Sequence, residues 1–407
     1  SCGRITNLYI WTVKKISLIA AIAFVAINLT AQITNKPGSQ YQFEEIAAIN
    51  KTEIKDQCRT GTCWSYSTLS FLESELIREG KGDHDLSEMF VARNAYLEKA
   101  ITYLRMNGKH QFDEGGEGHD IPFIIEKYGI VPEEVYTGLL HGKKRHNHAQ
   151  LVSVLSSMVK TLKNTKEGKL GPEWKNAING VLDAYLGAIP ESFEYRGKTY
   201  TPKSFAASLE LNMDDYAVVT SFTHHPFYKP FAIEVPDNWA MQTALNVPLD
   251  EMMEVIQYSL KKGYSVAWAT DVSEKGFSFR NALAIVPQHD SMIREKGKDN
   301  RLFNDAGSEK VGNAFNQPFP EKTITQELRQ ASFDNQTTTD DHGMHIVGMY
   351  KESKTGTPFY HVKNSWGTKN PANGYVYASD SYLRYKTICV MVNKKGIPKS
   401  IQKKLGL

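Results

Sequence analysis

Apolar and polar positions follow two different periodicities along this chain of 407 residues. From about residue 45 to 190, apolar residues recur at helical spacing, and Leu69, Leu72 and Leu76 fall on one face of a predicted helix. From about 195 to 395, short apolar runs such as AVVTSF and GYSVAWATDV predict strands instead. A helical half followed by a strand-rich half predicts an α+β fold, with a functional groove between the halves.

The N-terminal region has the layout of an export signal. Two lysines precede residues 16–29, which carry no charge, and the small residues Thr30 and Ala31 follow. This order predicts a secretory signal peptide over residues 1–31, with the true start near residue 13. The apolar stretch is short for a membrane span, which needs ~20 residues. We therefore expect a periplasmic or extracellular protein with no stable membrane insertion after the leader is removed.

Composition excludes several functional classes. The formal net charge is only +3, so no argument for binding nucleic acid or a membrane surface rests on it. Four cysteines are too few for a disulfide scaffold. The histidine pairs at 146–148 and 224–225 have no cysteines or carboxylates at ligand spacing nearby in the sequence. We interpret them as exposed loop residues and expect neither a metal nor a cofactor.

Cys63 stands at the start of the predicted helix, just after Gly61 and Thr62. Backbone N–H groups and the helix dipole favour a thiolate at such a position, and a thiolate is a nucleophile. The alternative is a small buried side chain or a disulfide with Cys58. The local sequence leaves both readings open.

Two later segments favour the nucleophile. Residues 341–350 and 360–367 read as buried strands, and they carry His342 and Asn364. Cysteine acyl transfer needs a histidine that takes and returns the thiol proton, and a group that orients the imidazole. Gln57 is placed to donate an N–H to a developing oxyanion. His345 is expected on the opposite face of its strand, in a structural role.

Three motifs resemble those of the papain-like cysteine peptidases: Gln57-x5-Cys63-Trp64, Asp341-His342-Gly343 and Asn364-Ser365-Trp366-Gly367. The resemblance implies Cys63 as nucleophile, His342 as base and acid, and Asn364 as the orienting residue. It further implies Gln57 as oxyanion donor and Trp366 as a shield over the histidine–asparagine hydrogen bond.

Further segments are similar to the bleomycin hydrolase and aminopeptidase C branch, among them Leu86-Ser87-Glu88, Glu114-Gly115-Gly116 and residues 126–132 and 262–268. The resemblance runs from about Phe43 nearly to the end. It implies one peptidase domain over 32–407, with the papain-like two-subdomain fold and large insertions. Gly115 and Gly116, together with Trp64, are then expected to contact the substrate peptide. Family relatives assemble as rings, so a homo-oligomer is a further expectation.

The predicted function is an exported thiol peptidase that acts through a Cys63 acyl-enzyme on peptide substrates, in the manner of an aminopeptidase. An endopeptidase with an open cleft is the alternative, because the family's C-terminal arm is short in this sequence, which ends at Leu407. A catalytically silent binding protein on the same fold and acyl transfer to an amine are further readings. Cys58 either pairs with Cys389 or stays reduced.

Overall fold

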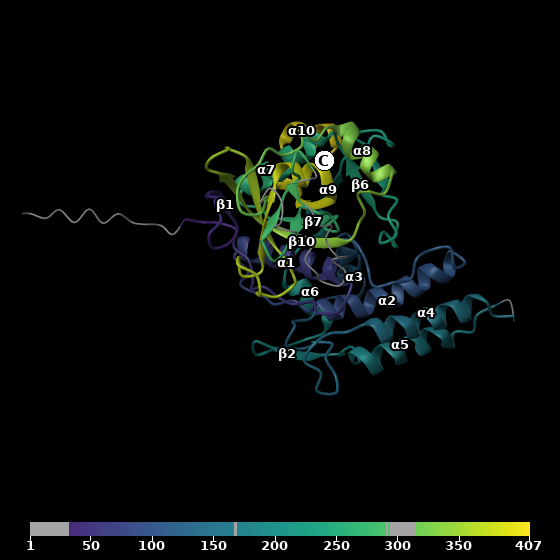
Figure 1. The fold of residues 1–407 in the computed structure, drawn as a ribbon. Coiled ribbons are helices and arrows are strands. Elements are labelled where there is room, and N and C mark those ends of the chain that lie inside the picture. The colour runs from purple at the N-terminus through teal and green to yellow at the C-terminus, as the bar shows by residue number, and fades with distance from the viewer. Residues whose placement is uncertain (1–31, 167–168, 290–291, 294–313) are drawn as a thin grey trace, which may run out of the picture. The chain divides into compact units, whose positions relative to one another are not determined.

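The computed structural model describes residues 32–166, 169–289, 292–293 and 314–407 (Figure 1). The chain divides into two units, Ser1–Gln32 and Ile33–Leu407. The predicted signal peptide therefore lies outside the described residues. Among the residues that are described, no helix combines the length and the apolar character that crossing a membrane requires.

One largely antiparallel sheet of eleven strands runs through the described part of the second unit, in the order β5-β6-β4-β13-β7-β10-β11-β12-β9-β8, with β1 also paired to β10. The bounds are β1 Phe43–Ala48, β4 Tyr216–Thr220, β5 Pro230–Ala232, β6 Thr243–Asn246, β7 Val266–Thr270, β8 Phe277–Ser278, β9 Leu283–Ala284, β10 His342–Glu352, β11 Pro358–Lys363, β12 Tyr375–Ser379 and β13 Thr387–Asn393. A separate hairpin joins β2 (Phe193–Tyr195) to β3 (Lys198–Tyr200).

Helices cover both faces of this sheet (Figure 1). Their bounds are α1 Cys63–Arg78, α2 Glu88–Arg105, α3 Asp120–Tyr128, α4 Ala149–Lys163, α5 Glu173–Leu186, α6 Pro202–Ser208, α7 Leu249–Lys261, α8 Gln326–Asp334, α9 Asp380–Lys386 and α10 Lys399–Leu405. Helix α1 packs on β7 and β10, and α2 to α5 pack beyond it. Helices α7 and α9 pack on the sheet and belong to a second core.

Alternate side chains of β13 belong to two different hydrophobic cores, one on each face of the sheet. Cys389 and Met391 belong to the core shared with α1 to α6, whereas Val390 and Val392 belong to the core shared with α7. Successive residues of a strand point to opposite faces, so a strand covered on both sides is apolar throughout. The α+β prediction is confirmed, and the helical elements α1 to α5 precede all of the sheet except β1.

Gly343 allows α1 to approach β10 closely. A Cβ at this position would lie 2.7 Å from Ser67 Oγ and 3.2 Å from the Trp64 Cα. Glycine has no side chain to hold the two backbones apart. The first turn of α1, which begins at Cys63, is therefore held against the first residues of β10, which begins at His342.

We expect Gly343→Ala to lower the free energy of unfolding by about 1–3 kcal/mol, because overpacking forces the helix from the strand. Activity should fall further than stability, since the same shift separates Cys63 from His342. Denaturant titration and a peptidase assay measure the two effects. Gly180→Ala is the matched control. Gly180 lies in α5 with open space around its Cβ position, and alanine there should stabilise the protein by about 0.5–1 kcal/mol. Unchanged stability and activity in Gly343→Ala would contradict this account.

Candidate active site

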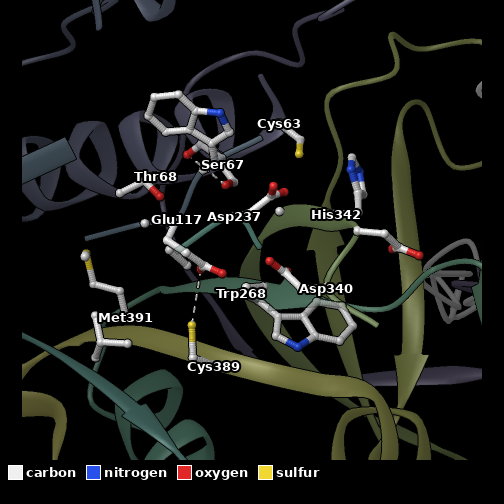
Figure 2. A pocket seen from close by; sticks show the side chains of 18 residues that line it. Cys63, Ser67, Thr68, Glu117, Asp237, Trp268, Asp340, His342, Cys389 and Met391 are labelled. Atoms are coloured by element: carbon white, nitrogen blue, oxygen red, sulfur yellow. Dashed lines mark hydrogen bonds between the residues drawn. The ribbon is translucent and has the colours of Figure 1, made fainter. Parts of the chain in front are cut away.

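Cys63 is the first residue of α1, as the sequence predicts, and it lines a pocket together with His342 (Figure 2). The preceding Thr62 caps the helix, and its carbonyl accepts the N–H groups of Ser65 and Tyr66. N–H groups in a first helical turn have no partner further back in the helix. The Cys63 side chain is partly exposed, so a substrate can reach its sulfur.

His342 is fixed in a defined tautomer by Asn364. The Asn364 Oδ1 lies 2.8 Å from His342 Nε2, and it also accepts the Ser365 backbone N–H at 2.8 Å. Because a backbone N–H only donates, the atom that it contacts must be the amide oxygen. The same oxygen therefore accepts a proton from Nε2 of the imidazole. The other ring nitrogen, Nδ1, carries the lone pair that can take the proton of the Cys63 thiol.

Trp366 covers this pair. Its ring centroid lies 4.7 Å from that of His342, at an interplanar angle of 35°. Phe277 and Phe279 pack edge-on against the other parts of the indole. A buried aromatic cover excludes water that would compete for the histidine–asparagine hydrogen bond.

The Gln57 side chain connects the motif at residues 57–64 to the motif at residues 364–367 by a hydrogen bond. Its Oε1 accepts the Ser365 hydroxyl at 2.5 Å, and its Nε2 donates to the Thr60 carbonyl at 2.7 Å. The side chain is buried at 1% exposure. One amide N–H is thus committed to Thr60, and only the second could serve an oxyanion. The backbone N–H of Cys63, in the first turn of α1, is the other candidate donor.

Burial dominates the electrostatics of the cysteine and the histidine. Burial, together with the carboxylates of Asp237 and Asp340, raises the pKa of the Cys63 thiol to about 12. The N–H groups of Gly343 and Trp64 oppose this by favouring the thiolate. Burial also lowers the pKa of His342 to about 4, and the hydrogen bond that His342 donates to Asn364 opposes this shift. The expectation that the helix terminus alone favours a thiolate is therefore too simple, because burial and two carboxylates oppose it.

Gly116 lines the pocket, and Gly115 precedes it in a tightly packed loop. A Cβ on Gly115 would meet the carboxylate of Asp237 at 1.9 Å, and one on Gly116 would meet the Trp64 ring at 2.9 Å. Trp64 itself is buried, and its indole N–H donates to the Glu114 carbonyl at 3.1 Å. Trp64 therefore packs behind the loop, and the Asp237 carboxylate occupies the space that a side chain at residue 115 would need. That Gly115, Gly116 and Trp64 contact the substrate stays a prediction.

The pocket residues that were not predicted as site residues include Glu117, Asp237, Asp340 and Cys389. Two of them lie next to predicted site residues in the sequence, since Glu117 follows Gly116 and Asp340 stands two positions before His342. Asp237 comes from the loop between β5 and β6 and has no such neighbour in the sequence. Cys389 and Cys58 are both free, which answers the question of their pairing.

His345 and the other histidines take no part in this pocket. His345 is fully buried, and its Nδ1 bonds to Ser70 Oγ at 2.9 Å. His146 and His148 were expected on an exposed loop, and this is wrong, because both are buried.

The prediction that His224 and His225 lack a nearby carboxylate is also wrong. Glu234 Oε2 lies 2.9 Å from His224 Nε2, and Glu234 Oε1 lies 2.7 Å from His225 Nε2. Among the described residues this group has three metal-ligand atoms within 4.8 Å of one another. However, Gln330 accepts the Thr223 N–H through its Oε1 and therefore donates from Nε2 to His224 Nδ1. His224 then carries its proton on Nε2 and donates to Glu234. Both ring nitrogens of His224 are then committed to hydrogen bonds, and neither offers a free lone pair to a metal ion.

Comparisons with known proteins agree with the motifs. The model of the Peptidase C1-like family matches residues 13–285 and 321–406. Aminopeptidase G of Lactobacillus delbrueckii subsp. lactis is 24% identical over 87% of this chain and 83% of its own length. Aminopeptidase C of Listeria monocytogenes is 24% identical over 91% of this chain and 86% of its own.

A solved structure extends the likeness to the fold. The crystal structure of PepW from Lactobacillus rhamnosis aligns with a TM-score of 0.66 and 21% identity, covering 89% of this chain and 84% of that one. The papain-like fold that the motifs implied is confirmed by the family match and this alignment. With most of its length matched by the family model, the chain belongs to the Peptidase C1-like family and is a cysteine-type peptidase.

Proposed function

We propose that this protein is an aminopeptidase that hydrolyses peptides through a Cys63 acyl-enzyme. The observation that carries the proposal is the tautomer of His342. Its Nε2 proton is held by Asn364 at 2.8 Å, and its free Nδ1 shares the pocket with the Cys63 sulfur. Its aminopeptidase relatives support the exopeptidase part.

In the acylation step, the Cys63 sulfur attacks the carbonyl carbon of the scissile peptide bond. The thiol proton moves to His342 Nδ1, and the electron pair of the carbonyl moves to its oxygen. The C–N bond then breaks, and His342 gives the proton to the leaving nitrogen. Because burial keeps the pKa of His342 near 4, the imidazole is neutral and ready to accept this proton at neutral pH.

In the deacylation step, a water molecule attacks the thioester carbon. His342 takes one proton from the water and returns it to the sulfur as the C–S bond breaks. The products are a carboxylic acid and the regenerated thiol. Because the Cys63 thiol and the His342 imidazole are both neutral at rest, neither a thiolate nor an imidazolium is present before a substrate arrives. Both charges form together during the attack.

Two substitutions test the proposed reacting groups, Cys63 and His342. Cys63→Ala should abolish hydrolysis, and His342→Ala should lower kcat by about 10²–10⁴, the usual contribution of general acid–base catalysis. Hydrolysis of an alanine amide of a fluorogenic amine measures both, with circular dichroism to establish folding. His289→Ala, on an exposed loop, is the histidine control and should keep full activity. Normal turnover by folded Cys63→Ala would refute the mechanism.

A second prediction tests the orienting role of Asn364. Asn364→Ala should lower kcat about 100-fold with little change in KM, since a misplaced base costs rate rather than binding. Asn364→Asp keeps an acceptor for Nε2 and should restore part of the rate. Its negative charge should raise the pKa of His342, so the acid limb of the pH–kcat profile should move to higher pH. An unmoved acid limb would show that residue 364 acts only through folding.

The third prediction separates exopeptidase from endopeptidase action. The enzyme should cleave the fluorogenic alanine amide with a free α-amine and leave its N-acetylated form nearly intact, with Cys63→Ala as the blank. Equal cleavage of an internal bond in a peptide blocked at both ends would favour the endopeptidase alternative.

We also propose export, on the basis of the lysines and the charge-free stretch at residues 16–29. N-terminal sequencing of the protein from a cell envelope or medium fraction tests it. A mature N-terminus near residue 32 would support it, and an intact N-terminus in the cytoplasm would refute it. Assembly into rings stays a proposal by family resemblance, which the mass in solution tests.

A further inference from the structure

The catalytic pocket contains a cluster of carboxyl groups that the mechanism does not use. Glu117, Asp237 and Asp340 all line it, beside Cys63 and His342. They come from three separate segments: the loop before α3, the loop between β5 and β6, and the residues before β10. Figure 2 shows the three side chains pointing into the same space. None of the three is required for proton transfer between cysteine and histidine.

Glu117 is the buried member of this cluster and lacks a full set of partners. Its side chain is 2% exposed. Its Oε2 faces the Cys389 thiol at 3.6 Å, and its Oε1 has no hydrogen-bond partner among the described residues. A buried carboxylate oxygen without a partner is costly, and the cost is removed when a cation or donor enters. The unpartnered oxygen therefore points to a ligand that donates hydrogen bonds.

The charges in the cluster specify a cation. Burial, together with the charges of Asp120 and Asp237, raises the pKa of Glu117 to about 7, while hydrogen bonds with Asp340 and the Cys389 thiol oppose the rise. The pKa of Asp340 is likewise raised by burial, by Glu117 and by Asp237. Lys99 is close enough to act on Asp237, but its Nζ donates to the Asp113 and Gly115 carbonyls beneath the loop. Lys99 is also absent from the pocket lining.

The size of the space admits a small cation. The cavity is about 30 Å³, which is more than the ~10–15 Å³ that one water-sized group needs. A primary ammonium group fits such a space. A metal ion is disfavoured by spacing, because among the described residues the group with three ligand atoms within 4.8 Å is the one at His224, His225 and Glu234.

We propose that Glu117, Asp237 and Asp340 bind the free α-ammonium group of the peptide substrate and so confine cleavage to its N-terminal end. The proposal rests on the aminopeptidase function proposed above and names the groups that recognise the amine. The α-nitrogen of a substrate's first residue is two bonds from the carbonyl carbon that Cys63 attacks. An ammonium site beside Cys63 therefore lies where that nitrogen must be. Its three N–H donors match three carboxyl acceptors.

Binding of the ammonium would also act on the nucleophile. Asp237 and Asp340 are the two carboxylates that raise the pKa of Cys63. A positive charge between them and the sulfur offsets their effect and favours the thiolate. A blocked substrate lacks this charge, so it should lose catalytic rate as well as affinity.

The first arm of the test measures binding without catalysis. Titration calorimetry on Cys63→Ala compares alanyl-alanine amide with its N-acetyl form. The free-amine form should bind about 10- to 100-fold more tightly, the range for hydrogen bonds to charged groups. Glu117→Gln and Asp340→Asn should each remove most of this difference. Asp237→Asn, on a partly exposed loop, serves the same purpose if the two buried variants do not fold.

The control variant is Glu321→Gln. Glu321 is another buried carboxyl whose pKa burial raises to about 7, but it bonds to Ser379 and the Val286 N–H, away from this pocket. It should leave the binding difference unchanged. The proposal is overturned if folded Asp237→Asn and Glu117→Gln keep the full preference for the free amine. It is equally overturned if N-acetyl-lysyl-alanine amide binds as tightly as the free-amine peptide, because the pocket would then hold a side chain.

The second arm measures catalysis in the protein with Cys63 intact. The ratio of kcat/KM for free and acetylated alanine amides should fall about 10-fold or more in Glu117→Gln, with part of the fall in kcat. If the wild-type protein hydrolyses neither substrate but Cys63→Ala still binds the free amine selectively, the proposed function fails and the ammonium site stands. If hydrolysis proceeds with no preference for the free amine, the ammonium site fails and the peptidase chemistry stands.

Discussion

The close contact between the first turn of α1 and the start of β10 is the constraint on which this site depends. At Gly343 the two backbones approach within a distance that excludes even a methyl group. Cys63, the proposed nucleophile, comes from a helix, and His342, the proposed base, comes from a strand far along the chain. This contact brings them to one pocket, and the sheet then adds Asn364 at the end of the neighbouring strand β11.

Charge in the pocket is balanced for a reaction that begins neutral. Burial disfavours both a thiolate at Cys63 and an imidazolium at His342, and nearby carboxyls add to the cost of the thiolate. These effects would hinder catalysis if the pocket stayed empty of positive charge. Under the proposed ammonium site, a substrate that carries its own ammonium group would remove the hindrance. Selectivity and activation would then have one electrostatic origin.

The sequence predicted those parts of the site that depend on local pattern. Spacing and flanking residues placed Cys63 at a helix start, His342 on a buried strand and Asn364 at a strand end. The α+β fold follows from the change of hydrophobic periodicity near residue 195. Asp237 could not be found in this way, because long-range packing alone brings its loop over Gly115. The effect of burial on Cys63 and the approach of Glu234 to His224 and His225 likewise depend on tertiary contacts.

The pairing of β10 has a consequence for how the enzyme loses its activity on heating. One edge of β10 pairs with β7 at His342–Ile346 and with β1 at Gly348–Glu352, while the other edge pairs with β11. Backbone amides in such a doubly paired central strand exchange with solvent only when much of the sheet opens. The strand that begins at His342 therefore belongs to the most protected layer of the protein. Thermal inactivation should then coincide with global unfolding, instead of preceding it through local fraying of the site.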